Sequence, residues 1–321
     1  MSAAPAPPRA AEFDNSITAF DQRLAQRRMW GVVFALLCAA LTLLALMVLA
    51  VLLTQIAEQG WPRLSTKLLT RFPSRLFPEE AGIKSALWGT IWLIGLTSVI
   101  SVTVGLGAAI YLEEFAPRNR LTDFIQLNLA NLAGVPSIVY GILGLVVFVR
   151  TLRMNYSILA GACTLSLVVL PVIIIASREA ISAVPNSIRL AAFAVGSTRW
   201  QAAWHHVLPM ALPGILTGVI LSISRAIGET APLIMVGALS FVQFVPGRSV
   251  APPSVDTSLT WLGQVVGDKY TALPHQVYTW AQDSRPAFQE LAASTIVVLL
   301  IILLSLNALA TFIRARYTPR L

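Results

Sequence analysis

Residues 215–239 read ILTGVILSISRAIGETAPLIMVGAL, an apolar run that is interrupted by one arginine and one glutamate. About 20 apolar residues are enough for a helix to cross the hydrocarbon core of a bilayer. Arg225 and Glu229 are four residues apart, so on a helix they share one face and can touch. An arginine at the centre of a membrane helix costs roughly 3 kcal/mol, so such residues mostly face a bundle interior or a wet cavity. The pair therefore marks a candidate substrate path, and the alternative is an ion pair that only fixes helix packing.

The composition of the whole chain is that of a membrane protein. Its 321 residues are 56% hydrophobic and 12% charged, whereas a soluble domain is about 25% charged. The net charge is +8, but no basic stripe with interleaved aromatic residues accompanies it. Basic loops that flank the membrane explain this charge better than nucleic-acid binding does. We therefore expect an all-α polytopic protein that is surrounded by lipid and binds no nucleic acid.

Six apolar segments are predicted to cross the membrane. They are residues 30–54, 86–112, 127–149, 157–177, 212–240 and 290–313. An even number of spans puts both termini on one side, and arginines flank the first and the last span, so both ends are predicted to be cytoplasmic. The expected organisation is a cytoplasmic head (1–29), a first span with its external loop (30–85), a transmembrane domain (86–314) and a cytoplasmic tail (315–321).

Two further segments outside the spans are assigned from composition. Residues 1–15 are rich in proline and alanine and are predicted to be disordered. Residues 241–289 are rich in Pro, Asp and Ser, and are predicted to be an external segment that lies on the interface or meets an external partner. The two cysteines lie inside apolar spans and the three histidines have no ligand-like neighbours, so no disulfide or metal site is expected.

The loop over residues 178–211 is predicted to form two short helices on the cytoplasmic side. Pro185 precedes a run of small residues with helical character, and Gly196 supplies a stop because it tolerates the left-handed cap conformation. Ser197 or Thr198 can then cap a second helix, which carries two tryptophans on one face. The alternative is an ordinary amphipathic connector.

This loop resembles the cytoplasmic signature of bacterial ABC importer permeases. The match consists of two alanines, three intervening residues, a glycine and a later Leu-Pro pair, at Ala191, Ala192, Gly196, Leu208 and Pro209. The resemblance implies the type I importer permease fold and a coupling helix that docks in a groove of an ATPase subunit.

Two positions depart from that signature. Leu190 stands where the family has glutamate, and His206 stands where it has isoleucine. Because Leu190 cannot form a salt bridge, we expect Arg189 and the apolar face of the helix to carry docking.

Two further stretches are similar to the signatures of the phosphate-specific (Pst) permeases. They are AGVPSIVYGILG at 133–144 and SRAIGETAPL at 224–233, and the ending of the second is more like the A-type than the C-type subunit. The resemblance covers roughly residues 86–314. It implies an alternating-access permease for inorganic phosphate in the bacterial inner membrane.

The residues of the expected phosphate path suit that anion. The guanidinium of Arg225 can bind two phosphate oxygens, and Glu229 can neutralise it in the empty state or accept the proton of a phosphate hydroxyl. Pro136 either breaks the third span so that Ser137 and Tyr140 line a cavity, or it is a packing kink. Thr230 either lines the path or bonds back to its own helix.

The chain is expected to be a permease subunit and not an enzyme. It contains no Gly-x-x-x-x-Gly-Lys-[Ser/Thr] loop, so ATP with magnesium must be hydrolysed by a separate subunit, and no cofactor is expected on this chain. The resemblance implies a second, PstC-like permease, a PstB-like ATPase dimer and an external PstS-like phosphate-binding protein. Two alternatives stay open: an ABC permease for another oxyanion such as sulfate or molybdate, and an ion-coupled secondary transporter.

Overall fold

The computed structural model of the chain describes residues 10–248 and 261–317. The chain divides into two compact units, residues 1–56 and 57–321. The first unit contains most of one long helix, α1 (Ala10–Gly60). All remaining elements belong to the second unit, in whose described residues helices alternate with loops and the one β-bridge is an isolated pair between Ser157 and Lys269.

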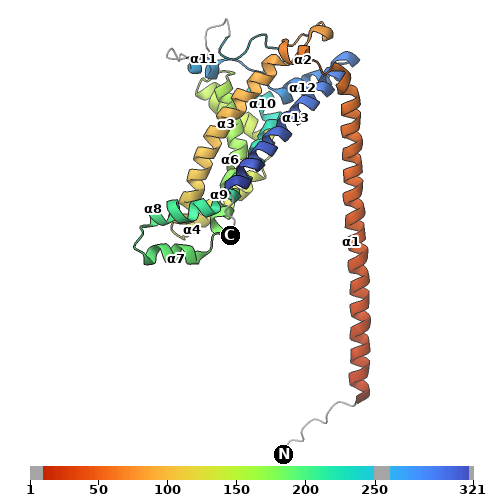
Figure 1. Ribbon diagram of the computed structural model, residues 1–321, viewed down its shortest axis with the longest axis vertical. Helices are drawn as coiled ribbons and strands as arrows, with labels where there is room; N and C mark the ends of the chain where they lie inside the picture. Colours follow the sequence, from red (N-terminus) through yellow and green to blue (C-terminus); the bar gives the residue numbers. More distant parts are fainter. Residues whose placement is uncertain (1–9, 249–260, 318–321) are drawn as a thin grey trace, which may run out of the picture. The chain divides into compact units, whose positions relative to one another are not determined.

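The second unit is built from four long helices, α3, α6, α9 and α13, with shorter helices at their ends (Figure 1). Its α-helices are α2 (Thr66–Thr70), α3 (Lys84–Ile110), α4 (Arg120–Ala133), α5 (Ser137–Gly144), α6 (Ile158–Ser182), α7 (Asn186–Ala194), α8 (Arg199–Ala202), α9 (Leu208–Gly228), α10 (Ala231–Val236), α11 (Trp261–Gly267), α12 (Leu273–Ala281) and α13 (Pro286–Tyr317). Three π-helical segments continue α3, α5 and α8, namely η3 (Tyr111–Phe115), η4 (Leu145–Thr151) and η5 (Ala203–Val207), and short 3-10 turns occupy η1 (Trp61–Arg63) and η2 (Pro78–Glu80).

The prediction of six spans is confirmed in number, with two changes of shape. Among the described residues, five helices are long and apolar enough to cross a membrane, and α4 with α5 and η4 makes a sixth only as a pair bent by 102°. The bend falls at Gly134 to Pro136, where proline removes a backbone donor and disfavours a helical residue before it. The prediction that Pro136 breaks the third span is therefore correct.

The fifth predicted span, residues 212–240, does not form one helix. The helix α9 ends at Gly228, and the chain passes through Glu229 and Thr230 before α10 begins. Pro232, the second residue of α10, has no N–H to donate to a preceding turn, so it interrupts a continuous helix. In the first turn of a new helix that N–H would have no partner, and proline is tolerated there. The span is thus interrupted next to its two charged residues.

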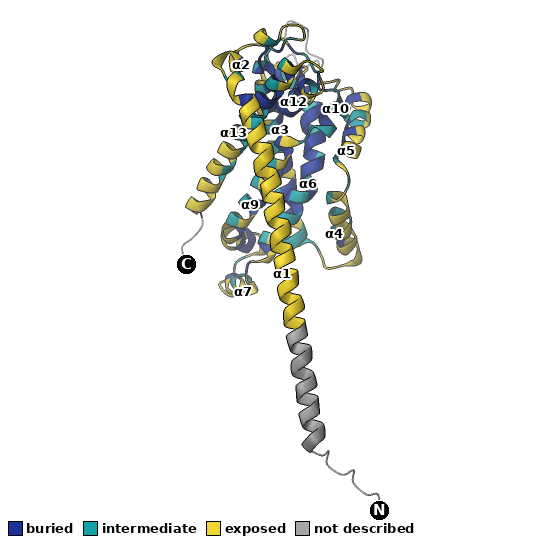
Figure 2. Ribbon diagram, turned by 90° about the vertical axis from the view of Figure 1, so that its right-hand side faces the viewer, coloured by how far each residue is buried: buried dark blue, intermediate teal, exposed yellow. Residues whose placement is uncertain are grey.

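Helix α6 forms the centre of the second unit (Figure 2). It packs against α3 on one side and α9 on another. Small residues permit the close approach to α9, since Gly218 and Gly214 lie against Ala176 and Ala180. Close packing of this kind replaces the hydrophobic effect as the main source of helix association in lipid.

One segment prediction needs correction, and a second segment has more regular structure than its composition indicated. Residues 10–15 belong to α1 and are not disordered, while residues 1–9 lie outside the described part of the chain. The segment 241–289 is folded in most of its described part, because α11 and α12 lie in it and Trp280 is only 4% exposed. Its polar composition concealed this core, in which Trp280 packs against Phe288 at a ring distance of 6.3 Å.

Candidate functional site

The two stretches that carry the family signature lie against each other. Helix α5 packs on α10, and the contact is centred on Gly141. A Cβ atom at this position would lie 2.8 Å from Pro232 Cα and 2.9 Å from Met235 Cβ, which is closer than real Cβ atoms come. The glycine therefore permits the broken third span and the broken fifth span to touch.

Arg225 and Glu229 form an ion pair at the end of α9. The Nε–H of Arg225 donates to Glu229 Oε1 at 3.3 Å. The prediction of contact is confirmed, but the two residues do not share a helix face, because Glu229 is the extended C-cap residue after Gly228. The Arg225 side chain is 53% exposed and that of Glu229 is 16% exposed. The Glu229 carboxylate is thus largely covered by the protein, while about half of the Arg225 side chain remains accessible.

Thr230 and Ser137 stand beside the two helix breaks. Both residues are half-buried, and Thr230 precedes α10 whereas Ser137 begins α5. The Thr230 side chain caps no backbone N–H of α10, and within the described residues its hydroxyl has no recorded partner in its own helix. This observation removes the ground for the alternative that Thr230 only bonds back to its helix.

Tyr140 has a different role from the predicted one. Its side chain is 7% exposed, and its hydroxyl donates to the carbonyl oxygen of Leu132 at 2.8 Å. The hydroxyl hydrogen is therefore used within the chain and is not offered to a substrate. Because Leu132 lies in the last turn of α4, the bond ties the two halves of the bent pair together.

The prediction of two short helices in the loop 178–211 is confirmed for the first helix only, because the second, α8, continues through η5 into α9 as one helix over Arg199–Gly228. Helix α7 follows Pro185 and ends before Gly196, whose φ of +85° is the left-handed conformation that glycine tolerates. Thr198 caps α8 in a capping box with Gln201. Trp200 and Trp204 stack with their ring centroids 5.6 Å apart.

The exposed surface of this loop includes several large apolar side chains. Leu190 is 62% exposed and Val195 is 81% exposed, and Phe193 is also exposed. Ala192 is buried, so the small residues of the signature only partly form the outer surface. The remaining predicted docking residues are Ala191 and Pro209, which are exposed, and Leu208, which is half-buried.

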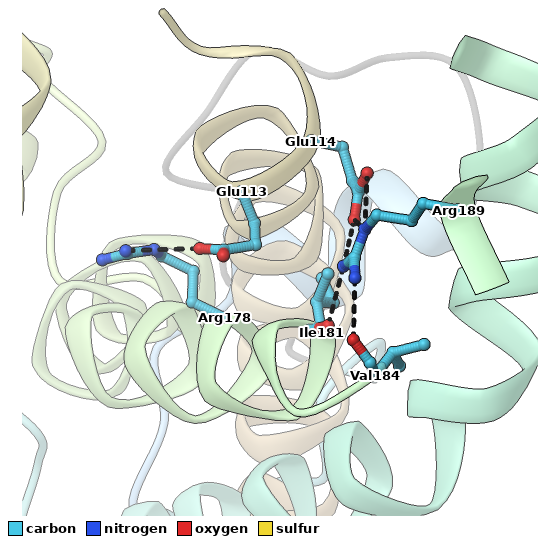
Figure 3. Close-up of polar contacts among 6 residues, drawn as sticks. All are labelled: Glu113, Glu114, Arg178, Ile181, Val184 and Arg189. Carbon is cyan, nitrogen blue, oxygen red and sulfur yellow. Dashed lines mark hydrogen bonds and ion pairs between the residues drawn. The ribbon is translucent and has the colours of Figure 1, made fainter. Parts of the chain in front are cut away.

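Arg189 is turned into the chain instead of outward (Figure 3). Its Nη2 and Nε groups donate to Glu114 Oε1 at 2.7 and 3.1 Å, and the two side chains are only 17% and 13% exposed. Its remaining donors bind the carbonyl oxygens of Ile181 and Val184 at 3.0 and 2.8 Å. The prediction that Arg189 carries docking is therefore corrected, because these bonds instead attach α7 to the ends of α3 and α6.

A second ion pair lies on the other side of the same segment. Glu113 Oε2 accepts from Nη2 of Arg178 at 3.4 Å, and Figure 3 shows the two neighbouring glutamates pointing to opposite sides of the end of α3. Phe115 adds a ring contact to Trp200 at 6.0 Å. We call the pairs Glu113–Arg178 and Glu114–Arg189 the double latch. Its two glutamates were missed in the sequence, although adjacent carboxylates just after an apolar span and before a basic loop are a readable signal.

The described residues offer no cluster suited to a metal ion. No group of three or more His, Cys, Asp or Glu side chains comes together in them. Cys38 and Cys163 are both free thiols.

Solved structures with a similar fold are known. Structures of the MetNI methionine ABC transporter in inward-facing conformations resemble this chain with a TM-score of 0.54 at 17% identity, and cover 73% of this chain and 95% of the matched chain. At this identity the likeness concerns the fold alone. The fold is that of the membrane subunit of a type I ABC importer.

The chain belongs to the family described as binding-protein-dependent transport system inner membrane components, whose model matches residues 101–321. It is therefore a multi-pass membrane permease subunit of an ABC importer.

Similar sequences include phosphate permeases, in line with the resemblance drawn from the two signature stretches. A probable ABC transporter permease protein, YqgI of Bacillus subtilis, is 32% identical over 68% of this chain and 75% of its own length. The phosphate transport system permease protein PstA 1 of Mycobacterium tuberculosis H37Rv is 34% identical over 67% of this chain and 72% of its own length. The probable phosphate transport system permease protein PstA of Methanocaldococcus jannaschii is 29% identical over 89% of this chain and 92% of its own length.

Proposed function

We propose that this chain is the PstA-type permease subunit of an ATP-driven importer of inorganic phosphate. The observation that carries the proposal is the state of Arg225. It sits in a predicted membrane span, beside a break in the helix, and its terminal nitrogens have no recorded partner among the described residues while Glu229 holds only Nε. A guanidinium in that state presents its planar fork to two oxygens of a tetrahedral anion.

Glu229 adds a basis for selecting phosphate. At neutral pH a phosphate ion keeps at least one hydroxyl hydrogen, which a carboxylate can accept, whereas sulfate carries none. A carboxylate that stays 16% exposed next to the guanidinium would thus repel an unprotonated oxyanion. Thr230 and Ser137 are proposed as further path residues because they begin, or directly precede, the helices that follow the two breaks.

The double latch supports a route from the ATPase to the membrane. We place the docking surface on the exposed apolar residues of α7 and of its C-cap, namely Leu190, Phe193 and Val195, with Gly196 allowing the chain to turn sharply after them. Arg189 and Glu114 then join α7 to α3 and α6 through short charge-assisted bonds. A displacement of α7 by an ATPase subunit is in this way passed to the helices that surround the path.

The complete importer needs other chains. Arg225 is 53% exposed in the isolated chain, which a second permease would cover if the path runs between two subunits. The proposed partners are a PstC-like permease, a PstB-like ATPase dimer that binds ATP and magnesium, and a PstS-like external binding protein. The termini of this chain are then cytoplasmic, on the same side as α7.

The proposal is tested with the intact transporter in proteoliposomes. Uptake of labelled phosphate is measured beside uptake of labelled sulfate, with ATP inside the vesicles. Uptake of phosphate that needs ATP and exceeds that of sulfate supports the proposal. Preferential uptake of sulfate or molybdate makes the chain a permease for another oxyanion, and uptake that survives without ATP identifies an ion-coupled transporter.

A further inference from the structure

A pocket with a net positive charge in its lining lies far from the double latch. It is formed by residues 73–75, by the chain just after α10, by α12 and by the start of α13, and it encloses about 370 Å³. The elements α2 and α12 lie at the opposite end of the second unit from α7 and α8 (Figure 1). We call it the outer pocket, since it faces outward if α7 faces the cytoplasm.

The charged side chains that line the outer pocket are two arginines and one aspartate. Arg285 binds both oxygens of Asp283, at 2.9 and 2.7 Å, and these hydrogen bonds keep the pKa of Asp283 down at about 2. Arg75 takes part in no ion pair within the part of the chain that the structure describes, and its guanidinium lies over the ring of Phe241. One positive charge of the lining is thus left without an acidic partner.

The same pocket contains a buried amide with unused capacity. Gln276 is 1% exposed and lines the pocket, and its Oε1 has no hydrogen-bond partner among the described residues. Leaving a buried acceptor without a hydrogen bond is unfavourable. A ligand that donates a hydrogen bond to Gln276 Oε1 therefore satisfies an acceptor that has no partner in the folded chain's described residues.

We propose that the outer pocket binds a protonated oxyanion, inorganic phosphate in the first place. The negative oxygens bind Arg75 and the outer edge of the Arg285 guanidinium, and a hydroxyl of the ion donates to Gln276 Oε1. An ionised carboxylate or a sulfate has no hydrogen to donate, so the lining favours phosphate over both. The volume leaves space for water around the ion. The choice of phosphate and the outward orientation rest on the proposed function, whereas the preference for a protonated oxyanion rests on the lining alone.

The test is equilibrium binding of labelled phosphate to the purified, intact transporter in nanodiscs, without ATP or binding protein. The variant Arg225→Gln is used as the background, so that the proposed path site does not contribute. In this background, Arg75→Gln is expected to weaken binding about tenfold or more, because a charge-assisted hydrogen bond is lost. Arg71→Gln is the matched control, since Arg71 lies in the same loop outside the pocket.

A second variant tests the role of the amide. Gln276→Leu is expected to reduce the preference for phosphate over sulfate, with weaker phosphate binding and little change for sulfate. Equal phosphate binding by the Arg75→Gln and Arg71→Gln variants overturns the proposal. The proposal is also overturned if Arg75→Gln leaves phosphate binding intact but weakens binding of the external partner. The pocket then binds an acidic side chain of that partner. Since binding is measured without transport, a transporter that carries another anion refutes the proposed function and still leaves the pocket testable with that anion.

Discussion

The double latch predicts that ATP hydrolysis can be separated from transport by a single change on this chain. In the variant Glu114→Gln, Arg189 keeps its bonds to the carbonyl oxygens of Ile181 and Val184 but loses its charged partner. We therefore expect α7 to remain folded and docked while its connection to α3 weakens. Phosphate uptake should fall more than ATP hydrolysis does.

The expected size of the effect follows from the geometry. Hydrogen bonds to charged groups contribute about 1.5–3 kcal/mol each, and the two side chains are 17% and 13% exposed, so solvent screens them only weakly. The glutamine retains an oxygen acceptor, so the net loss should be about 1–2 kcal/mol. This loss corresponds to roughly a 5–30-fold shift in the population with the connection intact.

A double-mutant cycle measures the connection directly. The ratio of phosphate uptake to ATP hydrolysis is compared in proteoliposomes for Glu114→Gln, Arg189→Gln and the double variant. Because each single change removes the same contact, the effects should fall short of additivity by about 1–2 kcal/mol. The second pair is the matched control, since Glu113 and Arg178 make one contact at 3.4 Å, and its coupling should be smaller.

The reasoning is refuted if the effects of Glu114→Gln and Arg189→Gln are additive. It also fails if uptake and hydrolysis fall in equal proportion in the Glu114→Gln variant, since the change then affects docking or assembly and not transmission.

Four more outcomes are expected. Arg225→Gln should abolish uptake in a complex that still assembles, and Arg225→Lys should also be impaired because a point charge does not replace the fork. Glu229→Gln should lower phosphate transport and raise the ratio of sulfate to phosphate uptake. Gly141→Ala should lower the melting temperature of the purified chain, because a methyl group 2.8 Å from Pro232 Cα forces α5 from α10 at a cost of about 1–3 kcal/mol. Burial lowers the pKa of His275, so the folded chain disfavours the proton that the unfolded chain binds below about pH 6.5. The stability of the folded chain should therefore fall as the pH is lowered from about 7.5 to about 5.5. The variant His275→Gln should reduce that pH dependence.

Each of these outcomes has its own control or contradiction. Normal uptake by Arg225→Gln rules out its contact with the ion, and an unchanged uptake ratio for Glu229→Gln makes that residue structural. Gly107→Ala is the control for the glycine, since a Cβ there has nothing within 4 Å, and equal melting temperatures contradict the packing argument. A pH dependence that is the same with and without the His275 side chain assigns it to other groups.

The sequence was sufficient for features that depend on local chemistry. Long apolar runs, the proline at 136 and the glycine at 196 each act through the backbone of their own segment, so the spans, the bend and the turn after α7 were predictable. The contact between Arg225 and Glu229 was also predictable, because four residues bring the two side chains within reach both on a helix and across the end of α9.

Features that depend on distant partners were not predictable in the same way. Arg189 was assigned to an outside partner because nothing in its own segment shows that Glu114, 75 residues earlier, lies against it. Tyr140 was assigned to the substrate path because the position of the Leu132 carbonyl depends on a bend of 102°. The folded part of 241–289 was missed since its apolar residues pack on other segments and show no run of their own.

The shortness of α10 has a consequence for how the protein is made. Six residues extend about 9 Å as a helix, whereas the hydrocarbon core is about 30 Å thick. A nascent α10 thus cannot enter the bilayer as an independent segment during synthesis. The elements on which it mainly packs, namely α5, α6 and η4, precede it in the chain. When the ribosome reaches residue 231, the helices against which α10 packs have already been synthesised. The order of translation thus matches the order in which α10 and its neighbours must assemble.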